Sequence, residues 1–201
     1  MGGLASNTEI LFASLVVSSL ALALAQGPLW PRLLGMGLLM GSALLIKQVV
    51  APEGCLAYAL FAWPLLRQRR WRMLLATALA YAALCLMPTL LIGGIYALRG
   101  EFDIWFESTV LAPLEYASGR IPLEQMFWRI TLAALAFRWL MVLALPALVL
   151  PWSDPLLRRL TFFALGWFAV ACLAVAGPGF FFPHYFLILL PPLSLPAAIG
   201  V

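Results

Sequence analysis

Long apolar stretches alternate with short polar segments along the whole chain. Seven apolar segments can be marked, at about 9–25, 33–46, 55–66, 73–98, 127–150, 160–176 and from 185 onward. A helix needs roughly 20 such residues to cross a bilayer. The third segment reaches that length only if 49–54 also lie at membrane depth. The seventh carries three prolines, which should kink or break it.

This pattern predicts an all-α fold: a polytopic transmembrane helical bundle that forms a single domain over residues 1–201. Composition supports the membrane assignment, because 65% of the residues are hydrophobic, only 10% are charged, and the mean hydropathy is +1.03. A soluble domain is about half apolar and a quarter charged. We therefore expect the lipid bilayer as a partner and no nucleic acid.

The basic residues predict how the chain is oriented. The densest positive cluster, residues 67–72, should be cytoplasmic, and alternation from it places loops 26–32 and 151–159 on the same side. The N-terminus and an outer loop at about 99–126 then lie outside. That loop is rich in acidic and aromatic residues and amphipathic in parts, so we expect a short helix along the membrane surface.

Small residues indicate close packing of the second segment. Gly37 and Gly41 form a GxxxG pattern, which lets helix backbones approach closely. The three cysteines (Cys55, Cys85 and Cys172) lie in apolar stretches without CxxC spacing and behave as small hydrophobic residues.

Glu9 and Lys47 are candidates for a polar site, since the predicted orientation brings both to the non-cytoplasmic surface. Glu9 either favours the positive end of a helix dipole or lies at the mouth of an outward-facing cavity. Lys47, the one lysine in the chain, ends the second segment. It either extends its ammonium group from the lipid to water or binds a lipid phosphate there.

Two further candidates lie in the second half of the chain. Arg138 falls about midway through the fifth segment, where an ionised side chain is expensive unless it faces a partner or a wet cavity. His184, the one histidine, begins the last segment at the predicted outer surface. It is either a hydrogen-bonded anchor or a group that orients an anionic headgroup. No phosphate loop, metal-ligand cluster or Ser-His-Asp pattern appears, so no cofactor is identifiable.

Three stretches of sequence also resemble a known family. The helix start Asn7-Thr8-Glu9, the run GMGLLMGSALLIKQ at 35–48, and FFPHYFLILLPPLSLPAA at 181–198 resemble GT-C class, family-39-like membrane glycosyltransferases. These bacterial proteins are related to dolichyl-phosphate-mannose protein mannosyltransferases. RGEFDIWFESTVLAPLEYA at 99–117 is similar to an outer segment of the same proteins.

The resemblance implies transfer of a sugar from a polyprenyl-phosphate donor to a glycan, lipid or protein acceptor at the outer face of a bacterial inner membrane. It further implies an inverting displacement, often with a divalent metal. Lys47 would hold the donor phosphate, and Glu9, His184, Arg138 and Tyr185 would line the cavity. The chain resembles the middle and C-terminal part of such enzymes, so the acidic catalytic loop is expected upstream and the catalytic residue is unknown.

Two alternatives remain open on the residues alone. A lipid or solute transporter would use a broken helix such as the proline-rich seventh segment. A non-catalytic membrane subunit would use the GxxxG helix to pack beside a partner.

Overall fold

A computed structural model describes residues 8–119, 121–149 and 154–199. These residues form helices and contain no strand, which confirms the predicted all-α class. Within this part of the chain, four helices are long and apolar enough to cross a membrane, and a bent pair makes a fifth candidate span. The chain is therefore an integral membrane protein with four or five candidate spans, fewer than the seven apolar segments. Two of the segments form apolar helices of 17 residues or fewer, Thr8–Leu24 and Pro183–Ile199.

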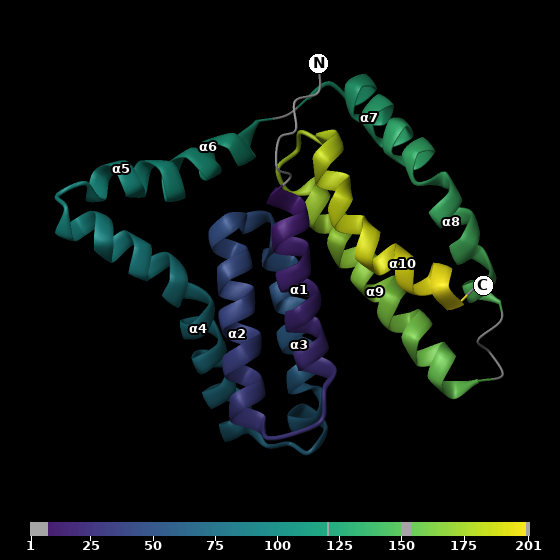
Figure 1. Cartoon of the computed structure of the whole chain (residues 1–201), viewed down its shortest axis with the longest axis horizontal. Helices are drawn as coiled ribbons and strands as arrows, with labels where there is room; N and C mark the ends of the chain where they lie inside the picture. Colours follow the sequence, from purple (N-terminus) through teal and green to yellow (C-terminus); the bar gives the residue numbers. More distant parts are fainter. Residues whose placement is uncertain (1–7, 120, 150–153, 200–201) are drawn as a thin grey trace. The chain divides into compact units, whose positions relative to one another are not determined.

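The chain folds as two compact units, Met1–Ala117 and Ser118–Val201. In the first unit, α1 (Thr8–Leu24), α2 (Leu29–Ile46) and α3 (Ala51–Arg67) lie side by side in alternating directions, and α4 (Trp71–Leu98) packs against α2 (Figure 1). Their core is apolar, with Phe12, Met36 and Met40 fully buried.

The end of α1 has a clear sequence cause. The residues Gln26-Gly27-Pro28 stop the helix, and Gly27 adopts φ +140°, a conformation that favours glycine. Arg32 then donates from Nε to the carbonyl of Leu22 (3.1 Å) and from Nη2 to that of Ala23 (2.7 Å). These bonds satisfy the last carbonyls of α1 and place a cation at the negative end of its dipole.

The short third apolar segment becomes long enough to cross a bilayer, because the turn before it adds residues. Lys47 leaves α2 in an extended conformation, and a 3-10 turn, η1 (Gln48–Val50), leads directly into α3. Together they make a candidate span of 20 residues, Gln48–Arg67. Residues 49–54 thus belong to the same candidate span as the third segment, and their depth in a membrane stays a prediction.

The glycines of α2 permit a close approach to α4. A Cβ atom on Gly41 would lie 2.7 Å from the backbone oxygen of Cys85, and one on Gly37 would lie 2.6 Å from Cβ of Leu84. Both distances are shorter than a carbon atom tolerates, so the GxxxG pattern marks a helix contact, as predicted.

The predicted surface helix of the outer loop is helical in three pieces. α5 (Phe102–Phe106), a π-helix η2 (Glu107–Leu111) and α6 (Ala112–Ser118) turn back from the end of α4 after Gly100, which adopts φ +74° (Figure 1). Trp105 is buried against Gly93 of α4, where a side chain would lie 2.8 Å from the indole ring.

The second unit contains α7 (Leu123–Ala136), α8 (Arg138–Ala144), a 3-10 turn η3 (Leu145–Leu148) and α9 (Pro155–Ala176). It ends with a second 3-10 element, η5 (Pro183–Leu189), and α10 (Leu190–Ile199). The fifth apolar segment is not one straight helix: it breaks at Phe137 with a bend of 66°. The proline-rich last segment begins as a 3-10 helix, but its three prolines lie further on, within α10, so a kink at the prolines stays a prediction. α10 packs against α8 and α9.

The α2–α4 contact makes a first prediction. Gly41→Ala should destabilise the protein by about 1–3 kcal/mol, because the new methyl group overlaps the backbone of α4. Gly94→Ala is the matched control, since a Cβ there meets nothing within 4 Å. It should be neutral or stabilise by up to about 1 kcal/mol. Thermal unfolding in detergent, followed by tryptophan fluorescence, measures both, and equal midpoints would contradict the packing.

Candidate functional site

An ion pair joins the first helix to the end of the second. Lys47 Nζ donates to Glu9 Oε1, while Thr8 Oγ1 donates to Glu9 Oε2 at 3.3 Å. The Glu9 side chain is only 3% exposed, whereas Lys47 remains 26% exposed. The two residues that the sequence predicted at one surface therefore contact each other, with the carboxylate buried and the ammonium group within reach of water. Asn7, which opens the first stretch of the family resemblance, lies outside the described residues.

Glu53 adds a second buried carboxylate to the same end of the first unit. It lies in the first turn of α3, six residues after Lys47, and is completely buried. Neither carboxylate oxygen has a hydrogen-bond partner among the described residues. The dipole of α3 favours a negative charge there by about 0.3–1 kcal/mol. That is far less than the several kcal/mol that desolvation of one ion costs.

Hydrogen bonds to two other elements, the π-helix η2 and α4, hold this end in place. Gln48 Nε2 in the turn after Lys47 donates to the carbonyl of Thr109 in η2 at 2.6 Å. Tyr81 Oη donates to the carbonyl of Gly54 at 3.1 Å, and the Tyr81 ring stacks on Tyr58 at 5.4 Å. We call this region, made by the starts of α1 and α3 and the end of α2, the Lys47 end.

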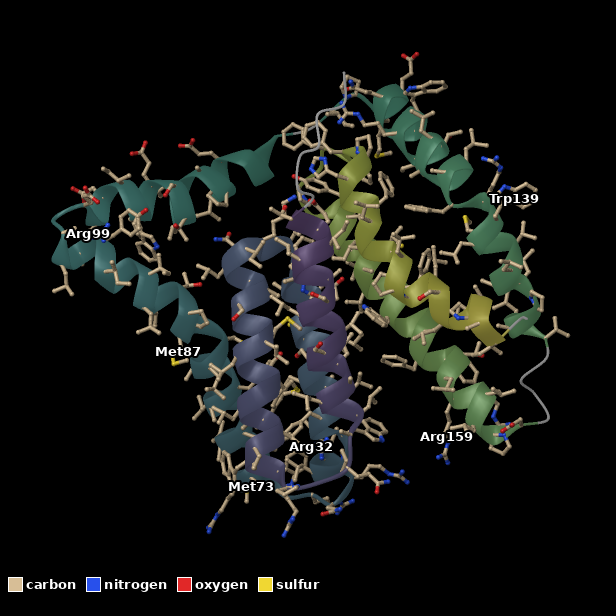
Figure 2. All side chains as sticks on the ribbon, in the orientation of Figure 1. Arg32, Met73, Met87, Arg99, Trp139 and Arg159 are labelled. Atoms are coloured by element: carbon tan, nitrogen blue, oxygen red, sulfur yellow. The ribbon has the colours of Figure 1, made fainter. Side chains whose placement is uncertain are left out.

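The opposite end of the first unit carries the basic residues. Figure 2 shows Arg32 and Met73 together there, beside the turn that contains the exposed arginines of 67–72. Loops 26–32 and 67–72 thus lie at one end and Lys47 at the other, as the orientation prediction requires. Which end faces the cytoplasm stays a prediction.

The second unit places His184 in an aromatic cluster. Its ring stacks on Phe182 at 5.6 Å with an interplanar angle of 11°, and meets Tyr185 edge-on at 4.6 Å. The Arg129 guanidinium lies over the Phe182 ring at 4.8 Å, and its Nη1 donates to the carbonyl of Phe180 at 2.6 Å. His184 is half-buried and Tyr185 is buried. Two of the three predicted cavity residues of this unit, His184 and Tyr185, are therefore in contact.

Arg129 is the residue that sequence reasoning missed. It lies nine residues before Arg138, on a different helical face. The available signal was its position near one end of an apolar segment, in a chain whose last segment is preceded by three phenylalanines at 180–182. An arginine placed in this way is well suited to a cation–π contact.

Arg138 does not join that cluster. It lies at the break between α7 and α8, next to Trp139, which Figure 2 labels. The side chain is exposed, donates from Nη1 to the carbonyl of Leu135 (2.7 Å) and lies over the Trp139 ring at 5.4 Å. These contacts are local to its own helices, and the cavity role of Arg138 stays a prediction.

The divalent metal implied by the family resemblance can be tested against the side chains. Among the described residues, no group of three His, Cys, Asp or Glu side chains could hold a metal ion. These residues therefore do not fit a divalent ion that is held by protein ligands alone.

No family model, curated protein or solved structure matches this chain. The glycosyltransferase resemblance therefore stays a hypothesis, and the geometry of the site has to be judged on its own chemistry.

The ion pair makes a stability prediction. Lys47→Met removes the cation that is paired with the buried Glu9 carboxylate, which should destabilise the protein by about 3–5 kcal/mol. Adding Glu9→Gln should recover much of that loss, because the remaining groups are neutral. Arg99→Met, at an exposed position at the end of α4, is the control and should change little. Thermal midpoints of the four proteins test this; the idea fails if Lys47→Met and Arg99→Met behave alike.

The aromatic cluster around His184 makes a second stability prediction. Arg129→Ala removes both the hydrogen bond to Phe180 and the contact with Phe182, so we expect a loss of about 1–3 kcal/mol and faster proteolysis near 180–185. Arg138→Ala removes an exposed arginine with local contacts only and serves as the control. Identical digestion patterns for the two variants would exclude a role for Arg129 in ordering this turn.

Proposed function

We propose that this chain is the membrane region of a glycosyltransferase that takes its sugar from a polyprenyl-phosphate donor. The observation that carries the proposal is the state of Lys47. A buried carboxylate fixes its ammonium group at one end of a helical bundle, and the side chain is still partly exposed. A lysine in this state is suited to a phosphate at the membrane interface, because it offers a positioned positive charge.

The sequence resemblance supports the same assignment from a separate direction. The stretch that ends in Lys47-Gln48 is one of its more specific parts, and Glu9 belongs to another of the quoted stretches. The proposed site faces the non-cytoplasmic side of a bacterial inner membrane, where polyprenyl-linked sugars serve cell-envelope synthesis. The acceptor is a glycan, a lipid or a protein.

The proposed step is an inverting displacement at the anomeric carbon of the donor. An acceptor hydroxyl oxygen forms a new bond to that carbon while the bond to the phosphate oxygen breaks. The electron pair leaves with the polyprenyl phosphate, and the acceptor proton passes to a base that this proposal does not identify. Lys47 binds the phosphate and stabilises the negative charge that grows on it, which favours the transition state over the bound donor.

The test is a transfer assay on the natively expressed protein in proteoliposomes. The donors are polyprenyl-phosphate-linked hexoses and pentoses, radiolabelled in the sugar, and the assay runs below the thermal midpoint of every variant. Lys47→Met should weaken donor binding by about 10- to 100-fold, the effect of one hydrogen bond to a charged group. Lys47→Arg should retain more binding because it keeps the charge, and Arg99→Met should bind as the wild type does.

Two results would contradict the proposal. Label that crosses the vesicle membrane without transfer would indicate a lipid or solute transporter. Neither transfer nor donor binding by the wild-type protein would indicate a non-catalytic membrane subunit. Unchanged donor binding in Lys47→Met would remove this residue from the site even if transfer occurs.

A further inference from the structure

The charges at the Lys47 end do not balance among the described residues. Glu9 and Glu53 are both buried there, and the ion pair among the described residues joins Lys47 to Glu9 and not to Glu53. The remaining cations of the first unit lie elsewhere. Arg32 caps α1 at the opposite end, the arginines of 67–72 are exposed at that end, and Arg99 is exposed at the end of α4. If both carboxylates are ionised, one negative charge is left at Glu53.

Glu53 cannot be explained as an ordinary helix-start residue. Such a residue keeps its carboxylate in water or bonds it to free amide groups of the first turn. Here the side chain is completely buried and neither oxygen has a hydrogen-bond partner among the described residues. Buried charges in proteins are otherwise paired with an opposite charge or bound to a metal ion.

We infer that Glu53 binds an alkali-metal cation at the Lys47 end. One carboxylate matches one positive charge, while a divalent ion would need the cluster of acidic or imidazole ligands that the described residues lack. The rest of the coordination would come from neutral oxygens. The chain leaves helical geometry at Lys47 and passes through a 3-10 turn before α3, beside the C-terminal carbonyls of α2.

This arrangement has a physical precedent in membrane proteins. Interrupted helices bind Na⁺ through carbonyls of the unwound segment and of helix C-termini. Irregular backbone at membrane depth is tolerated where such groups are satisfied. The cation would neutralise Glu53 without drawing Lys47 away from Glu9. The inference is independent of sugar transfer, because it rests on the charge of the folded protein alone.

Thermal unfolding of the purified protein tests the inference. Wild-type protein is melted in NaCl, KCl, MgCl₂ or choline chloride at equal ionic strength. A saturable rise of the midpoint by about 5 °C in Na⁺ or K⁺ over choline is the expected result. Glu53→Gln keeps the shape but removes the charge, and should lose that dependence. Glu101→Gln, at an exposed position, should retain it.

Several outcomes would overturn the inference. They are a wild-type midpoint that does not distinguish alkali cations from choline, an effect of Mg²⁺ alone, or the same Na⁺ response in Glu53→Gln. A Glu53→Gln protein that is as stable as the wild type in choline, with no cation response in either, would mean that the carboxyl group is uncharged.

Should Glu53→Gln fail to fold, binding of ²²Na⁺ to the wild-type protein provides the second measurement. About one ion per chain, displaced by unlabelled Na⁺ and not by choline, would support the inference. No bound ion would reject it.

Discussion

The first unit depends on the contact between Glu9 and Lys47, because this contact joins the start of α1 to the end of α2 and pairs the buried Glu9 carboxylate with a cation. A buried carboxylate needs a paired cation to be tolerated in the folded state, but the pair adds little net stability. Removal of either partner leaves a charge whose desolvation nothing offsets. The pair also fixes where Lys47 leaves the helix, and so sets the position of the turn that leads into α3.

The apolar pattern predicted most of the fold because a bilayer restricts the choices. A buried backbone without water must form helices, so the boundaries follow from breakers such as Gly27 and from the polar residue Lys47. Gly41 indicated the α2–α4 contact for a similarly local reason, since only a residue without a side chain lets the backbones of α2 and α4 come this close. The bend at Phe137 was not predicted, because no proline or glycine marks it, although the charged Arg138 interrupts the apolar run beside it.

The polar sites were predicted less completely. The pattern of charges along the chain predicted the direction of each helix and so placed Glu9 and Lys47 at one end. The same pattern does not predict which side chains are in contact. Glu53 follows Lys47 closely in sequence, yet its complete burial depends on how α3 packs, which sequence spacing does not encode. Arg129 likewise gains its role from the fold of 180–185, a turn distant in sequence.

Arg32 has a consequence for how the protein is inserted. Its guanidinium is committed to the last carbonyls of α1 and lies 5.3 Å from the ring of Phe61, so its charge is compensated within the folded unit. The exposed arginines of 67–72 have no such contacts, and the predicted orientation assigns the topogenic signal of this end to them. On that prediction, Arg32 stabilises the folded unit, while the neighbouring arginines direct insertion before the unit has folded.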